Sequence, residues 1–177
     1  SPTGIYNLFE SNAANSYDLG YTVDSQYAAN YSSATTFSNV FTGSTYNFPI
    51  TIATPLTDVG ITTIPVNSPR PGFIYENKIV YTNLGNQTIH TGTITFTNDS
   101  AVTITSVSQA GTIPNATGFT YNFTNLLPFE SRSFSVFMQV PTFPTVIAGQ
   151  VLTNTSSLTV NGDTILENNT NTSSEIV

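Results

Sequence analysis

Apolar and polar residues alternate along most of the chain from residue 73 onward, which is the pattern of half-buried β-strands. Six sets of apolar residues follow it, and the segment that runs toward Ile176 supplies a seventh strand. The sets are Phe73, Tyr75, Ile79 and Tyr81; Ile94 and Phe96; Val102 and Ile104; Phe119, Tyr121 and Phe123; Phe134, Val136, Met138 and Val140; and Leu152, Leu158 and Val160. About seven short strands in this length predict an immunoglobulin-like β-sandwich with antiparallel strands.

The first 57 residues also have strand-like patterns, at 5–9, 16–23, 27–32 and 46–52, but their composition differs. Six of the nine tyrosines occur there: Tyr6, Tyr17, Tyr21, Tyr27, Tyr31 and Tyr46. Large aromatic side chains suit the core of a thin sandwich, and they can also form a platform on which sugar rings stack. We favour the packing role and predict a small, aromatic-rich β-domain, complete or partial, at 1–57.

Prolines mark the boundary between the two parts of the chain. Pro55 and the prolines at 65–71 bracket residues 58–64, which form either a linker or the first strand of the second part. We place the boundary after residue 57, which gives domains 1–57 and 58–177. No segment has a helical period, so the sequence predicts an all-β chain of two β-sandwich domains in tandem.

The charge of the chain limits its partners. Only 7% of the residues are charged, and three basic residues against ten acidic ones give a net charge of −7. Nucleic acids and anionic lipid surfaces bind clustered Lys and Arg, so neither is expected as a partner. No apolar run approaches the ~20 residues that span a bilayer, so no membrane insertion is expected.

Cysteine is absent, which excludes disulfides and thiolate metal ligands. Thr, Ser and Asn occupy the positions where Lys and Glu are usual, and such a polar, weakly charged β-protein suits the outside of a cell better than the cytosol. We therefore expect an extracellular or cell-surface location.

Catalysis is not expected. His90 is the only histidine, so a Ser-His-Asp relay would depend on it, and no Gly-x-Ser-x-Gly turn is present. Its place between Ile89 and Thr91 at the start of a strand favours an exposed strand residue. Paired carboxylates for glycoside hydrolysis would lack a tryptophan to line a sugar cleft, because the chain contains none.

Two Asn/Asp turns are candidates for calcium, a cation that prefers hard oxygen ligands. Asp99 follows Asn98, and Asp163 follows Asn161 and Gly162. Neither turn has the spacing of an EF-hand, and the alternative is an ordinary turn in which the side chain bonds the backbone. No other cofactor is expected.

Lys78 raises the question of an isopeptide crosslink, as found in other bacterial adhesive sandwiches. Such a bond would need an asparagine such as Asn154 and an acid such as Glu130 on neighbouring strands. However, the alternation set by Tyr75 and Ile79 turns Lys78 toward solvent, which spares the cost of burying an ammonium group. We therefore disfavour the crosslink.

Several short motifs together carry a resemblance to a known family. They are Arg70-Pro71-Gly72-Phe73, the stretch 81–87, the stretch 125–130 with Arg132 after it, and Glu167-Asn168-Asn169. With these motifs, residues 58–177 resemble the conserved-repeat, immunoglobulin-like module of very large surface proteins that Flavobacterium-type Bacteroidota export by type IX secretion.

This resemblance implies that the chain is a section of a longer polypeptide. It also implies O-glycosylation at Asp-Ser/Thr followed by a small or aliphatic residue, which Ser100 and Thr164 satisfy; unmodified turn hydroxyls are the alternative.

These observations together favour a non-enzymatic stalk, spacer or adhesive section of a secreted surface protein. Its partners would be neighbouring domains of the same polypeptide. One alternative is a filament or pilus subunit, in which residues 1–9 or the segment after Asn161 complete the sheet of an identical subunit. Another is a carbohydrate-binding module that holds surface glycans on the tyrosines between residues 17 and 31.

Overall fold

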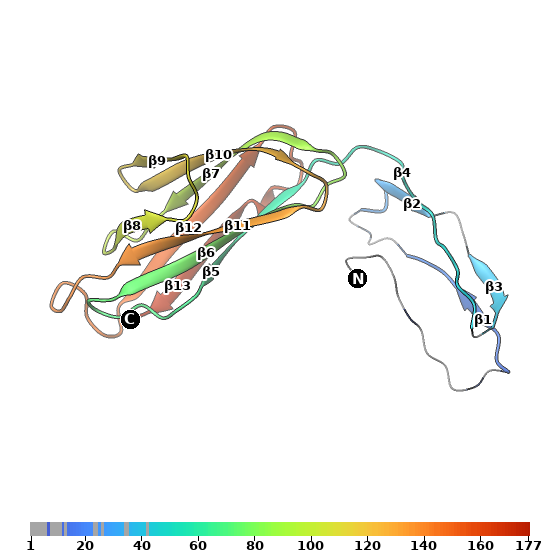
Figure 1. Cartoon of the computed structure of the whole chain (residues 1–177), viewed down its shortest axis with the longest axis horizontal. Coiled ribbons are helices and arrows are strands. Elements are labelled where there is room, and N and C mark those ends of the chain that lie inside the picture. Colours follow the sequence, from blue (N-terminus) through green and yellow to red (C-terminus); the bar gives the residue numbers. More distant parts are fainter. Residues whose placement is uncertain are drawn as a thin grey trace. The chain divides into compact units, whose positions relative to one another are not determined.

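The computed structural model describes residues 7, 12, 14–22, 25, 27–33, 36–41 and 43–177. It divides into two compact units, Ser1–Pro55 and Leu56–Val177. The regular elements of the described residues are strands, apart from one 3-10 turn (Figure 1). The described part of the chain is therefore all-β. The boundary between the units falls after residue 55, where the sequence predicts it after residue 57.

The described part of the first unit contains two antiparallel sheets of two strands each. One pairs β1 (Tyr17–Leu19) with β3 (Phe37–Val40), and the other pairs β2 (Tyr31–Ser33) with β4 (Ile50–Ile52). The strands predicted at 16–23, 27–32 and 46–52 are present but shorter. Strand β3 was missed, and the strand predicted at 5–9 lies outside the described residues except for residue 7.

Aromatic contacts in the described part of the first unit centre on Phe37. Its ring lies 4.9 Å from that of Tyr46 and 5.2 Å from that of Phe48. Tyr21, by contrast, is 46% exposed. The described tyrosines therefore differ in environment: Tyr46 takes part in packing as predicted, whereas Tyr21 faces solvent. Tyr6 lies outside the described residues.

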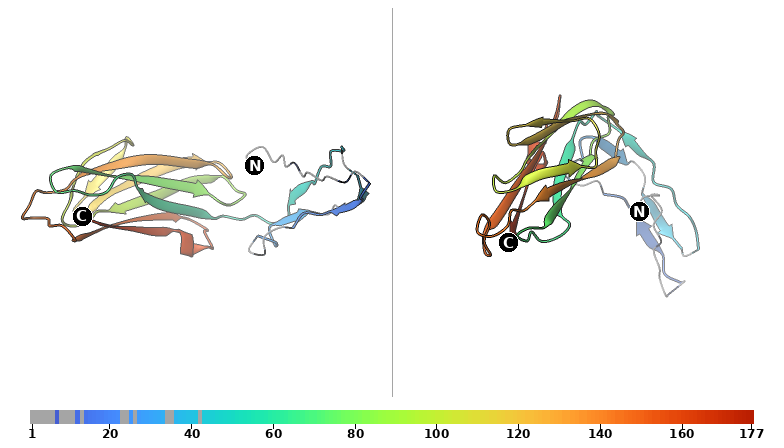
Figure 2. Two further views of the ribbon diagram at one scale, coloured as in Figure 1. Left: turned by 90° about the horizontal axis from the view of Figure 1, so that it is seen from below. Right: turned by 60° about the vertical axis from the view of Figure 1, so that its left-hand side comes forward.

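The second unit is a β-sandwich of nine strands in two antiparallel sheets (Figures 1 and 2). The four-stranded sheet has the order β5-β6-β11-β8 and the five-stranded sheet the order β13-β12-β7-β10-β9. The strands are β5 (Val59–Pro65), β6 (Ile74–Asn83), β7 (Ile89–Thr97), β8 (Thr103–Val107), β9 (Thr112–Asn115), β10 (Gly118–Leu126), β11 (Ser131–Gln139), β12 (Val151–Val160) and β13 (Thr170–Ile176).

All seven predicted strands are present in this unit, and two more accompany them. Residues 58–64, which the sequence left as either linker or strand, form β5 at the edge of the four-stranded sheet. Strand β9 was missed because it has only four residues, carries Pro114 and is mostly exposed. A 3-10 turn, η1 (Leu166–Asn168), precedes β13.

The core lies between the two sheets and is apolar along most of its length. Its largest fully buried side chains are Tyr75, Tyr81, Phe96, Phe123, Ile79, Ile94, Leu126, Met138, Leu152, Val59, Val136 and Val140. The prediction that Phe73 belongs to this face was wrong, because β6 begins at Ile74 and Phe73 is 66% exposed. The buried face of β6 includes two polar residues instead, Asn77 and Asn83.

The strands β5 and β13 begin at one end of the sandwich and finish at the other. At the first end, Leu56 exchanges hydrogen bonds with Asn86: its N–H donates to Oδ1 at 2.8 Å, and its carbonyl accepts the Asn86 N–H at 3.0 Å. At the opposite end, the N–H of Val177 donates to the carbonyl of Gln150 at 2.9 Å. Figures 1 and 2 show the C-terminus at the far end of the sandwich from the start of β5.

Polar side chains join β5 to the five-stranded sheet. The N–H of Thr63 donates to Oδ1 of Asn171 on β13 at 2.8 Å, and the hydroxyls of Thr63 and Ser156 are hydrogen-bonded. The N–H of Val59 donates to Oδ2 of Asp163 at 3.2 Å. These bonds satisfy backbone N–H groups on the unpaired edge of β5, which we call its edge donors. Pro65, at the end of the strand, has no N–H group.

Candidate functional site

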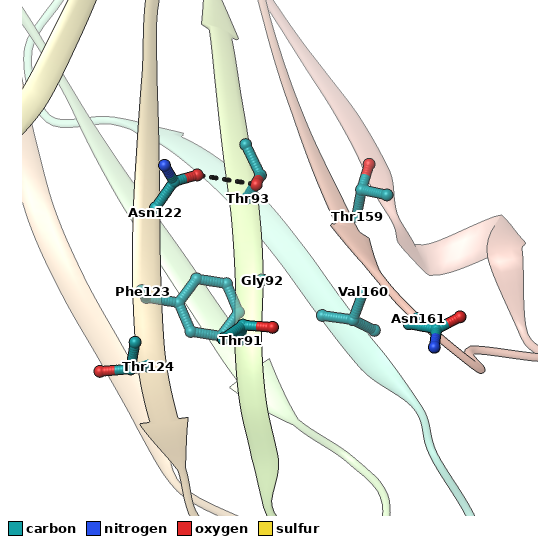
Figure 3. Close-up of a pocket in the computed structure, with 9 residues that line it drawn as sticks. All are labelled: Thr91, Gly92, Thr93, Asn122, Phe123, Thr124, Thr159, Val160 and Asn161. Atoms are coloured by element: carbon teal, nitrogen blue, oxygen red, sulfur yellow. Dashed lines mark hydrogen bonds between the residues drawn. The ribbon is translucent and has the colours of Figure 1, made fainter.

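One hollow lies on the five-stranded sheet, where β10, β7 and β12 run side by side. Strand register places Asn122 and Thr159 on either side of Thr93, and Val160 opposite Gly92. The hollow has a volume of about 580 Å³. In Figure 3 the Thr93 hydroxyl donates to Oδ1 of Asn122, at 2.8 Å.

The packing of Phe123 and Val160 requires a glycine at position 92. A Cβ at this position would lie 2.3 Å from Cζ of Phe123 and 2.7 Å from Cγ1 of Val160, closer than real side chains pack. Figure 3 shows the Phe123 ring and Val160 on either side of Gly92. Glycine therefore lets the Phe123 ring fill the space beneath the sheet, where it is buried.

The chemistry of this hollow is restricted to hydrogen bonding. Its lining consists of Thr91, Gly92, Thr93, Asn122, Phe123, Thr124, Thr159, Val160 and Asn161. None of these side chains titrates near neutral pH, so the hollow has no general acid or base. Its hydroxyl and amide groups can bind water or the hydroxyls of a sugar, but the Phe123 ring is 1% exposed and offers no stacking surface.

A second hollow, of about 650 Å³, lies between the edge strands β8 and β9. Its walls combine hydroxyls such as those of Thr105 and Thr117 with apolar groups such as Pro114 and Phe119. Strand β8 carries an irregularity here, because its register against β11 shifts beside Thr105. The Thr105 hydroxyl donates to the carbonyl of Phe137 at 3.0 Å.

An electrostatic cluster is built on Arg132 of β11, which forms an ion pair with Glu130. Its Nε donates to Oε1 of Glu130 at 2.6 Å, and its Nη2 donates to the carbonyl of Asn125 at 2.6 Å. The N–H of Leu127 donates to Oε2 of Glu130 at 2.7 Å. Since Asn125 has φ 52° and Phe129 φ 62°, these bonds hold a turn whose backbone is unfavourable for residues other than glycine.

The same cluster shifts the acidity of its members. The hydrogen bond from Arg132, and then the Leu127 N–H, hold the pKa of Glu130 below its ordinary value. Hydrogen bonding to Glu130 raises the pKa of Arg132. Burial, and then the neighbouring Tyr121, raise the pKa of Tyr81 to about 12. A tyrosine that stays protonated and a carboxylate committed to arginine are suited to structure rather than to proton transfer.

The candidate calcium ligands bond the backbone. Oδ1 of Asp99 accepts the Ala101 N–H and Oδ2 accepts the Thr153 N–H, both at 2.8 Å. Oδ1 of Asp163 accepts the Ile165 N–H at 2.9 Å. Both aspartates therefore act as turn residues that tie neighbouring segments together. No three His, Asp or Glu side chains gather as a metal site within the described residues.

The three residues considered for an isopeptide bond are not brought together. Lys78 is exposed on the outer face of β6, as its position in the alternation predicts, whereas Asn154 is fully buried between the sheets. Glu130 is engaged with Arg132. The register explains the separation, because the neighbouring residue Asn77, which points inward, receives the Asn154 amide.

The remaining candidates lie at the surface. His90 is exposed on β7, and Ser100 and Thr164 are exposed beside the aspartates of their turns. Their accessibility is compatible with the predicted O-glycosylation, which stays a prediction. The described residues contain no helix that could span a lipid bilayer.

Sequence reasoning missed the buried polar residues Asp58, Asn77 and Asn169 and the half-buried Asn168. The pair of asparagines at 168–169 was noted as part of a family motif, but its contacts were not foreseen. An acid or amide at an inward position of a strand was the available signal for Asn77. Asp58 stands directly before a strand, where sequence alone does not distinguish a buried acid from an exposed one.

No protein-family model and no curated protein match the chain. Among solved structures, a CARDB domain from Pyrococcus furiosus, determined in complex with di-metal ions, has a TM-score of 0.47 and 15% identity over 69% of this chain and 89% of its own. AvmM, which catalyses macrocyclization in alchivemycin A biosynthesis, has a TM-score of 0.42 and 16% identity over 68% and 89%. BslA, a bacterial hydrophobin, has a TM-score of 0.38 and 16% identity over 70% and 96%.

At these identities no ligand, metal or activity is transferred to this chain. The immunoglobulin-like β-sandwich that the Flavobacterium-type resemblance implies is the observed fold of the second unit. The type IX setting stays a prediction.

Proposed function

We propose that the chain is a non-enzymatic structural section of a large extracellular protein, in which the second unit acts as a spacer that transmits tension. One observation carries the proposal: β5 and β13 begin at the same end of the sandwich, run in the same direction and finish at the other end. A section that its neighbours pull from both sides needs its entry and exit at opposite ends.

The contacts between β5 and β13 support this role. Tension along the sandwich loads the hydrogen bonds between Thr63, Asn171 and Ser156 in shear, so that they must break together. The hydrogen bonds between Leu56 and Asn86 lie at the end of the sandwich where the preceding segment would pull. The uncharged Thr and Ser residues on the outer face of the five-stranded sheet limit nonspecific electrostatic attraction to other surfaces.

The edge strands of the sandwich carry features that hinder pairing with a strand of another molecule, and this favours the spacer role over a filament subunit. Asn171 and Asp163 occupy edge donors of β5, Pro114 interrupts β9, and the irregularity beside Thr105 disturbs β8. Such devices are the usual protection against strand addition. The segment after Asn161 is paired within its own sandwich as β13, and residues 1–6 and 8–9 lie outside the described part of the chain.

Single-molecule stretching of the full chain between its two ends tests the proposal. We expect a force peak that releases residues 56–177, with a contour-length gain of roughly 400 Å at about 3.4 Å per residue. Asn171→Ala is expected to lower the peak force, whereas Thr172→Ala, on the outer face of the same strand, is not. Extension of this unit without a resolved peak, or an Asn171→Ala peak as high as that of the unmodified chain, would overturn it.

A further inference from the structure

Two adjacent asparagines at the end of η1 each hold a carboxylate. Nδ2 of Asn168 donates to Oδ1 of Asp58 at 2.9 Å, and Nδ2 of Asn169 donates to Oδ2 of Asp163 at 2.9 Å. Oδ2 of Asp163 also accepts the N–H of Val59, the residue that follows Asp58. Two carboxylates and two carboxamides are therefore gathered around the first peptide of β5.

The other halves of both carboxamides are unsatisfied. Oδ1 of Asn168 and Oδ1 of Asn169 are buried and have no hydrogen-bond partner among the described residues. Asn169 is 7% exposed, and Asp58 is fully buried. A buried acceptor without a partner destabilises the folded state, and in native proteins such an atom often marks the place of an ion or a water.

A half-turn of each carboxamide about its Cβ–Cγ bond would exchange the positions of the nitrogen and the oxygen. The turned side chain would still fit, because the NH₂ group and the oxygen are similar in size. The oxygens of Asn168 and Asn169 would then face Asp58 and Asp163 in place of the nitrogens. Oxygens so arranged repel one another unless a cation, or a donor such as water, lies between them, and a cation also balances the charge of the two carboxylates. The cluster is thus complete either with two amide donors or with one cation.

We propose that Asp58, Asp163, Asn168 and Asn169 form a calcium site at the start of β5. The donors are all oxygens, two from carboxylates and two from amide carbonyls, which is the mixture that Ca²⁺ prefers. Mg²⁺ fits less well, because it retains several waters in a strict octahedron, and Asp58 and Asn169 are buried. Bound calcium would join the start of β5 to η1 and to the turn before it.

Asp99 provides the contrast that makes the proposal specific. Like Asp163, it lies in an Asn/Asp turn and both of its oxygens accept backbone N–H groups. The difference between the two aspartates lies in the carboxamide beside each. The nearby Asn154 uses both ends of its carboxamide, since its Oδ1 accepts the Asp99 N–H and its Nδ2 donates to Asn77. Because this carboxamide has no unsatisfied oxygen, Asp99 is not part of the proposed cation site.

Thermal unfolding of the full chain, freed of metal by a chelator and then titrated with CaCl₂, tests the site. A ligand that binds the folded state raises its stability in proportion to RT ln(1 + [L]/Kd), so we expect the melting temperature to rise with calcium. Asp163→Asn should abolish the rise, and the matched variant Asp99→Asn should keep it. MgCl₂ at equal concentration, which screens the net charge equally, should give a much smaller rise.

Asn168→Asp supplies a second test that does not depend on Asp163→Asn folding well. It adds a carboxylate beside Asp58, so we expect lower stability in chelator and at least tenfold tighter calcium binding by calorimetry. Equal destabilisation with and without calcium would show that the asparagines are structural partners only. The absence of any calcium-dependent rise in the unmodified chain, or an equal rise with magnesium, would also overturn the proposal.

Discussion

Asn154 and Asn77 meet at the centre of the sandwich, where the Asn154 side-chain amide donates to Oδ1 of Asn77 at 2.8 Å. Asn77 belongs to β6 of the four-stranded sheet and Asn154 to β12 of the five-stranded sheet, and both are fully buried. Oδ1 of Asn154 also accepts the N–H of Asp99 at 2.9 Å. One side chain thus links both sheets and the turn after β7 through an otherwise apolar core.

Asn154→Ala is expected to lower the free energy of unfolding by about 2–3 kcal/mol, because it leaves the Asn77 carboxamide and the Asp99 N–H without their partner. Urea denaturation measures the loss. Thr153→Ala, on the exposed face of the same strand, should change stability by less than about 0.5 kcal/mol. If the double variant with Asn77→Ala loses the sum of the two single losses, the two residues are not coupled as described.

Gly92→Ala is expected to destabilise the second unit by about 1–3 kcal/mol, because the added methyl group would force the Phe123 ring and Val160 to move. Thermal unfolding, with Thr93→Ala as the control for the same hollow, measures the effect. A Gly92→Ala protein as stable as the unmodified chain would mean that the space beneath Gly92 is looser than the structure indicates.

Asn171→Val is expected to expose the edge of β5. The N–H of Thr63 loses its acceptor, and a strand edge with free donors recruits other strands. Light scattering during size exclusion should therefore reveal association that increases with protein concentration. Thr172→Val, which adds an apolar group to the outer face without touching β5, controls for surface hydrophobicity. Equal behaviour of the two variants would argue against the guarding role of Asn171.

Acidification is expected to weaken the Glu130–Arg132 cluster. Because the pKa of Glu130 is lowered in the folded state, the carboxylate contributes stability above the ordinary glutamate pKa of about 4.3, and this contribution is lost as pH falls from there through the lowered value. Glu130→Gln should therefore lose less stability than the unmodified chain between pH 6 and about pH 3. Urea denaturation across this range gives the comparison.

Local alternation was sufficient to predict the sandwich. Inward positions such as Ile79, Phe96 and Val136 are apolar, outward positions such as Lys78 and Thr95 are polar, and the period of two is imposed by the strand itself. The errors arose at strand ends and short edges. Phe73 continues the pattern but precedes β6, and β9 is too short and too exposed to leave a pattern.

The sequence by itself therefore determined the all-β class, the main strands and the two-part organisation, because each depends on residues close together in the chain. The tertiary structure decided which polar residues are buried and what they bind. Asn77 meets Asn154, and Asn168 meets Asp58, across separations of 77 and 110 residues. The alternation of apolar and polar residues along a strand does not predict such pairs. A carboxamide at an inward position is stable only if a distant segment of the chain provides its hydrogen-bond partner.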